Sequence, residues 1–395
     1  MIILRGLVVL LTYIGLGLGY LPGLRMNRAS IALVGAAALM AWGVLDLKAA
    51  WGAIDYKTLV FLFGMMIISA NLATAGFFQL SLDYLMRYVR SPFGLIVVLT
   101  FGSGALSALF MNDTIALILT PLVVGLTVAL KLNPIPYLLA LAGATNTGSV
   151  ATLSGNPQNI LIGSFSGISY VEFAKALAPL AIVGLCIQIG LLWWLYPDVR
   201  STQPTLKPEH LRYRVLKPLL TKSLLVTTGL LVAFLVGIPP AEATLIAAGM
   251  LLVTRRLKPE RILQKVDWDL LLMFSGLLIL TEGVQKLGVL NGFSQLVHTP
   301  LSILGVTALL SNLVSNVPAV LLLHHLIPHP DDRTWLLLAA GSTLAGNLTL
   351  LGSVANLIVA EAVAKQGHRL TFWEHLRFGL PLTAMTLALT YVWIV

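Results

Sequence analysis

The sequence predicts an all-α polytopic membrane protein built from two inverted repeats, each with spanning helices, a re-entrant helical hairpin and a broken transmembrane helix. Three observations support this fold class: long apolar runs, an uneven distribution of Lys and Arg, and segments that recur in the same order. Of the 395 residues, 57% are hydrophobic and 10% are charged, and the mean hydropathy is +0.90. Soluble domains carry about 25% charged residues, so this composition excludes an ordinary soluble protein.

The apolar runs are long enough to cross a bilayer, since about 20 helical residues suffice, and they recur along the whole chain. We expect the first of them, within Met1–Leu24, to be a retained helix, because no small-residue cleavage site of a signal peptide follows it. The single cysteine, Cys186, excludes an internal disulfide and a thiolate cluster for a soft metal. The composition therefore predicts a helical membrane protein without a cofactor or a metal site.

The basic residues predict the orientation in the membrane. Two polar segments, Pro197–Lys222 and Arg255–Lys265, are rich in Lys and Arg, and the apolar runs between them are joined by the short segment GIPPAE. Loops rich in Lys and Arg stay in the cytoplasm. If successive loops alternate between the two sides of the membrane, starting from these segments, most of the 25 basic residues lie on the cytoplasmic side. We therefore expect a multi-pass protein of the cytoplasmic (inner) membrane with both termini outside and the linker 198–218 inside. The net charge of +9 then reflects basic loops rather than a nucleic-acid partner.

The second half of the chain repeats features of the first half. The segment IDYKTLVFLFG, from Ile54, resembles VDWDLLLMFSG, from Val266. Further along, SALFMNDTIAL, from Ser107, resembles SNLVSNVPAVL, from Ser311, and TLSGNPQNILI resembles TLLGSVANLIV. Each match is weak alone, but all of them occur in the same order, which indicates an internal repeat.

The two repeats are expected to be inverted. In the orientation above, Asp55 begins a helix that runs inward, whereas Asp267 begins one that runs outward. Inverted repeats are a signature of secondary transporters. We place the first repeat at 1–197, the cytoplasmic linker at 198–218 and the second repeat at 219–395.

Each repeat contains two interrupted apolar segments. As one helix, residues 93–130 would be nearly twice as long as the hydrocarbon core is thick, so we predict a helical hairpin whose tip is MNDT. Its counterpart is 300–326, with SNVP in the middle. The segments 136–168 and 335–365 each cross once but contain Gly, Asn and Ser in their middle, which predicts broken helices. Unwound backbone within a membrane is tolerated where it is buried in protein or lines a cavity.

The polar residues at these four interruptions are the candidate binding site. The alternative is that their small residues only allow helices to pack closely. Packing alone does not explain why asparagines occur at each interruption, so we favour a site. The candidate substrate-binding residues are Asn112, Thr114, Thr152, Ser154, Gly155, Asn156, Asn159, Ser315, Asn316, Asn347, Thr349, Gly352, Ser353 and Asn356.

Asp113 is the candidate proton-coupling residue. A carboxylate within a membrane is costly and is usually functional, and burial would favour its protonated form. The alternative is that Asp113 caps a helix beginning at Thr114. The histidines His324, His325 and His329 lie at an outer edge without a pattern of partner carboxylates, so we do not expect them to bind a metal.

The segments FMNDTIALILTP, ATLSGNPQNILIG and GNLTLLGSVANLIVAE resemble the ion transporter superfamily, and the resemblance covers nearly the whole chain. That group includes arsenite permeases, sodium/proton antiporters and sodium-coupled dicarboxylate and citrate carriers. The resemblance implies a homodimer that works by an elevator mechanism, with substrate at the two hairpin tips. Carboxylate carriers have a Ser-Asn-Thr signature there, whereas this chain has Met111-Asn112-Asp113 and Ser315-Asn316-Val317. The first tip is closer to the arsenite permease pattern, in which Asp follows Asn.

These observations favour a transporter over an enzyme. The expected function is proton-coupled efflux of arsenite or antimonite. The alternative is a sodium- or proton-coupled permease for a small carboxylate or another inorganic anion, and a channel is a further possibility. A membrane-embedded enzyme would need a set of metal ligands or a nucleophile and base, and neither pattern occurs. The sequence has no phosphate-binding loop of the P-loop type, so ATP-driven transport would require a separate ATPase subunit.

Overall fold

The computed structural model describes residues 2–201, 215–254, 258–290, 292, 296–327, 330–365, 367 and 369–395. Every regular element in this part of the chain is a helix, which confirms the predicted fold class. Most of the predicted linker 198–218 lies outside the described residues, as does His329.

The first half contains twelve helical elements. They are α1 (Ile2–Leu18), α2 (Arg28–Ala41), α3 (Leu47–Gly52), α4 (Tyr56–Ala75), α5 (Phe77–Met86), α6 (Pro92–Leu109), α7 (Asn112–Ala129), α8 (Pro134–Ser149), η1 (Leu153–Gly155), α9 (Pro157–Ser166), α10 (Tyr170–Leu195) and η2 (Pro197–Arg200).

The described part of the second half continues with the following elements. They are α11 (Lys217–Leu235), α12 (Pro240–Leu252), α13 (Pro259–Leu263), α14 (Trp268–Lys286), α15 (Pro300–Val314), α16 (Asn316–Leu326), α17 (Asp332–Ala345), η4 (Leu350–Gly352), α18 (Val354–Ala364) and α19 (Phe372–Ile394).

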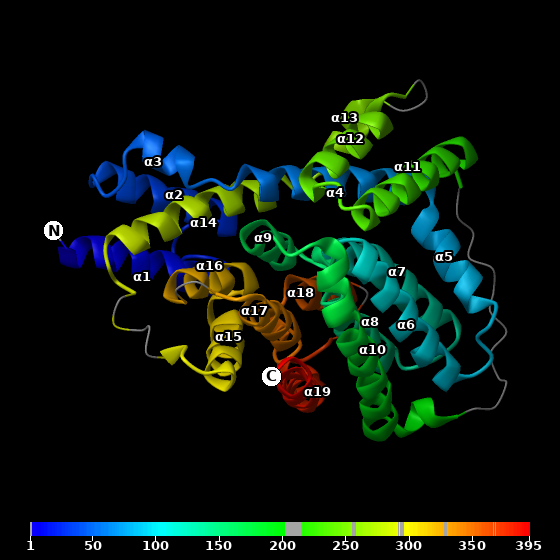
Figure 1. The fold of residues 1–395 in the computed structure, drawn as a ribbon. Coiled ribbons are helices and arrows are strands. Elements are labelled where there is room, and N and C mark those ends of the chain that lie inside the picture. Colours follow the sequence, from blue (N-terminus) through cyan, green and yellow to red (C-terminus); the bar gives the residue numbers. More distant parts are fainter. Residues whose placement is uncertain are drawn as a thin grey trace.

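Six helices of the described chain are long and apolar enough to cross a membrane by length and composition, namely α4, α6, α7, α10, α11 and α14. Shorter apolar helices lie between them. In Figure 1, the short helices α9 and α18 lie in the middle of the molecule, between the bundle α6–α8 and the helices α15–α17. The interrupted segments are therefore surrounded by other helices.

The order of elements in the first half recurs in the second half. The series α4, α6, α7, α8, η1, α9, α10 corresponds to α14, α15, α16, α17, η4, α18, α19, with a single 3-10 turn at the same place in each. Helix α6 packs against α8 as α15 packs against α17. The repeat detected in the sequence is thus a repeat of secondary structure, while its boundaries at 197 and 219 stay predictions.

The first hairpin turns at Phe110 and Met111, between α6 and α7. The N-cap of α7 is Met111, which makes no side-chain cap bond, and Asp113 lies in the first turn of that helix. The alternative interpretation of Asp113 as an N-cap is therefore wrong. The helix begins two residues earlier than expected, because the tip of the hairpin closes in only two residues.

The second hairpin turns at one residue, Ser315, between α15 and α16. Its φ of 80° and ψ of 159° lie in a region that favours glycine. A serine held in this conformation indicates that the surrounding structure constrains the tip. Such strained residues cluster at functional sites.

Close packing of glycines positions the first broken helix. A Cβ on Gly148 of α8 would collide with the backbone of Gly104 of α6, and one on Gly155 would collide with the Ser149 carbonyl. Helix α8 can therefore lie against the hairpin, and the chain can fold back at η1, because these positions have no side chain. Pro157 then begins α9 at N1, where it needs no hydrogen-bond partner.

We expect Gly148→Ala to lower the free energy of unfolding by about 1–3 kcal/mol, the usual cost of overpacking. The added methyl group would push α8 away from α6. The measurement is the Tm of the purified protein in detergent. The control is Gly125→Ala in α7, where an added Cβ would meet nothing within 4 Å. Equal Tm values for the wild type and Gly148→Ala would contradict the close crossing.

Candidate functional site

Asn146, near the end of α8, is the hub of a buried hydrogen-bond network between the two halves. Its Nδ2 atom donates to the Oδ1 atoms of Asn347, at 3.0 Å, and Asn356, at 3.1 Å. Its Oδ1 atom accepts from Asn112 Nδ2, at 3.2 Å, and from Ser353 Oγ, at 2.8 Å. All four hydrogen-bonding positions of this amide are thus occupied, and they join the first hairpin to the break of the second broken helix, at Asn347, and to the start of α18.

Thr343 forms the matching connection from the second half. In the register that pairs Thr152 with Thr349, Thr343 corresponds to Asn146. Its Oγ1 atom accepts from Asn156 Nδ2, at 3.1 Å, and donates to Asn159 Oδ1, at 3.4 Å. The two broken helices therefore bond to each other reciprocally. Helix α8, before the first break, bonds to α18, after the second break, and α17, before the second break, bonds to α9, after the first.

Asn159 and Asn356 hold the two breaks in the same way. Asn159 Nδ2 donates to the carbonyl oxygens of Ser149, at 3.1 Å, and Thr152, at 2.9 Å. Asn356 Nδ2 donates to the oxygens of Gly346, at 2.8 Å, and Thr349, at 3.0 Å. These are equivalent positions in the two halves. The asparagines thereby bond carbonyls that the broken helices leave without helical partners.

The hydroxyl residues at the breaks attach them to the hairpins. Thr152 Oγ1 donates to the Ala108 carbonyl of α6, and Thr349 Oγ1 donates to Asn312 Oδ1 of α15, at 2.9 Å. Ser154 Oγ lies 2.8 Å from the hydroxyl of Tyr170. These residues brace the backbone around the network rather than point their hydroxyls at a free space.

The two hairpin-tip asparagines each leave one oxygen without a partner. The Oδ1 atoms of Asn112 and Asn316 are buried and accept no hydrogen bond from any described residue, and the two residues are only 4% and 9% exposed. Buried polar atoms are nearly always paired, so two unpaired acceptors at corresponding positions of the repeat indicate where a ligand would supply donors.

Asp113 lies beside this centre, next to Asn112 in the first turn of α7. It is partly buried, and it interacts electrostatically with Asp267, before α14, and with Arg28, at the start of α2. Helices α2 and α14 pack against each other. The charged groups that influence this carboxyl group therefore lie on helices outside the two hairpins and broken helices.

Most of the predicted site residues come together in this network or line the breaks, where Gly155 and Gly352 leave room for the turns η1 and η4. Ser315 lies at the strained tip beside Asn316. Thr114 is half-buried, and Thr114, Ser315 and Asn316 make no side-chain hydrogen bond to another described residue. Among the described residues, no three His, Cys, Asp or Glu side chains form a group that could hold a metal.

Sequence reasoning missed Asn146, Thr343 and His375, all of which belong to the network. The first two lie within the regular helices α8 and α17, before the breaks. The repeat register pairs Asn146 with Thr343, and that pairing of two polar residues in apolar arms was a usable signal. His375 has no such signal, because its partner is a backbone carbonyl.

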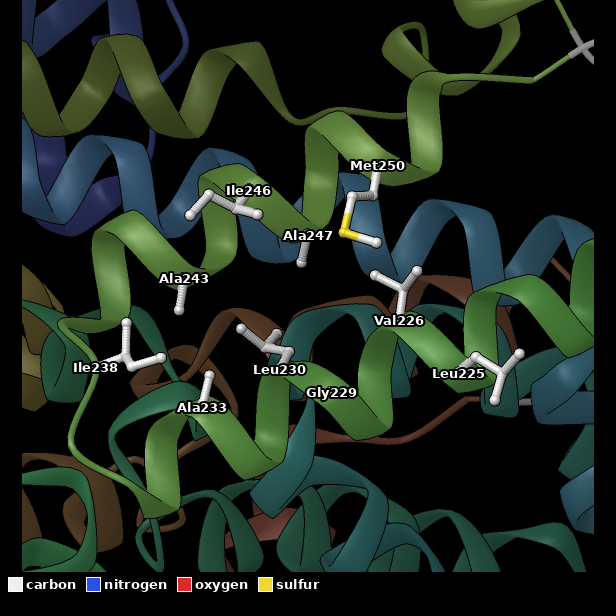
Figure 2. Close-up of a pocket in the computed structure, with 10 residues that line it drawn as sticks. All are labelled: Leu225, Val226, Gly229, Leu230, Ala233, Ile238, Ala243, Ile246, Ala247 and Met250. Carbon is white, nitrogen blue, oxygen red and sulfur yellow. The ribbon is translucent and has the colours of Figure 1, made fainter.

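An apolar groove of about 360 Å³ lies elsewhere, between α11 and α12. Figure 2 shows its lining, which consists of aliphatic side chains, Met250 and Gly229. It offers no polar group to orient a hydrophilic substrate. We therefore assign the transport site to the polar centre and not to this groove.

Apolar spanning helices, an element order that occurs twice and a polar centre built from broken helices define a membrane transporter. The model of the CitMHS citrate transporter family matches residues 9–332, and the chain belongs to this family. This confirms the resemblance to the ion transporter superfamily.

Three curated relatives and one solved structure illustrate the range of the similarity. The silicon efflux transporter of Oryza sativa is 32% identical, over 93% of this chain and 92% of that protein. An uncharacterized transporter of Mycobacterium bovis is 30% identical over 94% of both chains, and a Dictyostelium discoideum transporter named arsB is 26% identical over 92% and 86%. The YdaH transporter of Alcanivorax borkumensis, whose topology is described as unusual, has a TM-score of 0.59 at 14% identity, covering 100% of this chain and 97% of that one. That likeness concerns the fold alone.

We expect Asn146→Leu to destabilise the protein more than any single change at the hairpin tips. It would leave four buried partners unpaired, and each unpaired group costs about 1–3 kcal/mol unless the structure relaxes. The measurement is Tm in detergent. The matched control is Asn71→Leu: Asn71 is equally buried, but its amide donates only to Ile67 of its own helix in the described chain. An equal loss of Tm in Asn146→Leu and Asn71→Leu would contradict the role of Asn146 as the hub of the network.

Proposed function

We propose that the protein is a secondary active transporter that exports arsenite or antimonite across the cytoplasmic membrane in exchange for protons. The candidate substrate-binding residues are those of the polar centre, and Asp113 is the candidate proton-coupling residue. The observation that carries this proposal is the pair of buried, unpartnered oxygens on Asn112 and Asn316.

The unpaired oxygens favour a substrate that donates hydrogen bonds. Arsenite at neutral pH is an uncharged trihydroxy species, and its O–H groups could donate to both asparagines. The hub itself is made of neutral amides and hydroxyls, which match an uncharged polar molecule. Silicic acid has the same chemistry, and the rice relative is named a silicon efflux transporter. The Dictyostelium relative carries the name arsB.

Asp113 is placed to link proton binding to movement. When ionised, its carboxylate is attracted by Arg28 and repelled by Asp267; when protonated, it loses both interactions. Arg28 and Asp267 belong to α2 and the start of α14, whereas Asp113 belongs to a hairpin. A change of protonation would therefore alter the electrostatic interaction between the hairpin and those helices.

An elevator mechanism is consistent with this division. The hairpins and broken helices, α6–α9 and α15–α18, would form the moving part. The helices α1–α4 and α11–α14 would form the scaffold and, in a homodimer, the contact between subunits. The hub would travel as one unit, since its hydrogen bonds lie within the moving part.

The alternative is a sodium- or proton-coupled permease for a small carboxylate or other anion. The family is named for the transport of citrate, a carboxylate, which favours this alternative. Helix N-termini suit anions, and α7, α9, α16 and α18 all begin at the polar centre. The two unpaired asparagine oxygens would then be ligands for Na⁺, because hard cations take oxygen ligands.

We expect arsenite efflux from proteoliposomes to follow an imposed pH gradient and to be abolished in Asp113→Asn, because the amide cannot bind and release a proton. The control is Asp332→Asn, which changes an exposed carboxylate at the start of α17. Unchanged arsenite flux in Asp113→Asn would show that Asp113 is not the proton-coupling residue, while arsenite would still be a substrate. Absence of arsenite flux in the wild type, with sodium-dependent citrate flux in its place, would establish the alternative.

We expect Asn112→Leu and Asn316→Leu each to raise the KM for arsenite about tenfold, which corresponds to about 1.4 kcal/mol per lost hydrogen bond. Asn316→Leu removes an unpaired acceptor, so it should leave Tm unchanged or raise it while binding weakens. The measurement is concentration-dependent flux together with Tm. An unchanged KM in Asn316→Leu would contradict a ligand at the second tip.

A further inference from the structure

His375, in the first turn of α19, is an ionisable group at the polar centre that the scheme above does not use. Its side chain is 1% exposed. Its Nε2 atom lies 3.0 Å from the backbone oxygen of Asn347. A carbonyl oxygen only accepts, so Nε2 carries a hydrogen. The Asn347 side chain is bonded to Asn146, so a single residue separates the imidazole ring from the hub.

The other ring nitrogen has no partner among the described residues. Nδ1 is buried and makes no hydrogen bond to any of them. Asn356 Nδ2 approaches the ring at 3.5 Å, but its two hydrogens are donated to the carbonyls of Gly346 and Thr349. A second proton on the ring would place a buried charge and an unpaired N–H there, both of which are costly. The ring is therefore neutral in this conformation, with its proton on Nε2.

Helix α19 presses on the break of the second broken helix at two successive turns. One turn after His375, a Cβ on Gly379 would collide with the same Asn347 oxygen and would come within 2.8 Å of the Leu348 oxygen. The missing side chain of Gly379 allows the approach, and His375 supplies the hydrogen bond. Together they hold α19 against the carbonyls exposed by the break, and we call this contact of His375 and Gly379 the latch.

The first half has no equivalent latch. Helix α10 begins with SYVEF and α19 with TFWEH, and in both the hydroxyl residue caps the helix by accepting from the backbone of the Glu three positions later. By this register Phe173 corresponds to His375, and Leu177 corresponds to Gly379. Both are buried, and neither can donate a hydrogen bond. The two halves of the repeat therefore differ at the position where the His375 imidazole reaches the network.

Few charged groups surround the latch. The helices packed on α19 are α8, α10, α15, α17 and the turn η4. On α19 itself, Glu374 and Arg377 interact electrostatically with Tyr196. In the described chain, none of the ionisable residues on these elements hydrogen-bonds to His375: Tyr137, Tyr170, Glu172, Lys175, Cys186, Asp332, Arg333, Glu374, Arg377 and Tyr391.

We propose that His375 is a second proton-binding site of the transporter, whose protonation releases α19 from the break of the second broken helix. The proton comes from water and binds to the Nδ1 lone pair, and it returns to water when the latch closes again. In the latched arrangement the hydrogen added at Nδ1 has no acceptor among the described residues and the charge on the ring is buried, so proton binding favours the separation of α19 from the break. This inference rests on the proposed function only in taking the proton as the coupling ion.

The first test is the pH profile of arsenite exchange at equal pH on both sides of the proteoliposome membrane. Histidine changes charge between about pH 5 and 8 when unperturbed, and coupling to the moving state should produce a several-fold change of rate with pH. In His375→Gln the amide can still donate to Asn347 but does not titrate. We expect this variant to keep flux at high pH and to lose the part of the pH dependence that His375 contributes, with the part due to Asp113 retained, whereas His298→Gln, at an exposed position, keeps the whole profile. A wild-type pH profile in His375→Gln would overturn the proposal.

The second test does not depend on the substrate. NMR of the protein labelled with ¹⁵N-histidine in nanodiscs, compared with His375→Phe, isolates the His375 signal; the substitution copies Phe173 and should fold. We expect the Nε2–H tautomer at high pH and a second proton at low pH while the protein remains folded. The Nδ1–H tautomer, or one neutral form throughout, would overturn the proposal. Absent arsenite flux in the wild type would refute only the proposed function, because this titration is still measurable.

Discussion

The structure depends on satisfying the backbone of two broken helices within a chain that is otherwise apolar. A break exposes carbonyl and N–H groups, and in a bilayer no water is available to pair with them. Asn159 and Asn356 donate to the exposed carbonyls at equivalent positions of the two halves. Because each of these asparagines also bonds to the opposite half, the same side chains that repair the breaks hold the halves together.

The hub at Asn146 makes this arrangement rigid. An amide with all four positions occupied can adopt few orientations, so the first hairpin tip, the break of the second broken helix and the start of α18 are held in one geometry. Rigidity of this kind suits a binding site, since the ligand need not order the groups that hold it. The two tip oxygens and His375 Nδ1 are then buried polar atoms of this centre that have no hydrogen-bond partner among the described residues.

The two halves share a framework but not their chemistry. Thr343 replaces Asn146, Val317 replaces Asp113, and His375 replaces Phe173. Ionisable groups therefore approach the centre from different sides, Asp113 from the first hairpin and His375 from the last helix. A symmetric framework allows two equivalent end states, and unequal groups within it allow the protonation of particular sites to favour one of them.

The amino-acid sequence alone determined the fold class, the family and the positions of the four interruptions. These follow from local rules: apolar length decides what can span a bilayer, and Gly, Pro and Asn decide where a helix stops. It also identified Asn112, Asn156, Asn316 and Asn356, because each lies at an interruption. Only the tertiary structure decided which of these meet, since Asn146 and Thr343 lie within regular helices and acquire their roles from contacts with residues about two hundred positions away. The same holds for His375, whose partner is a carbonyl that any residue could have supplied.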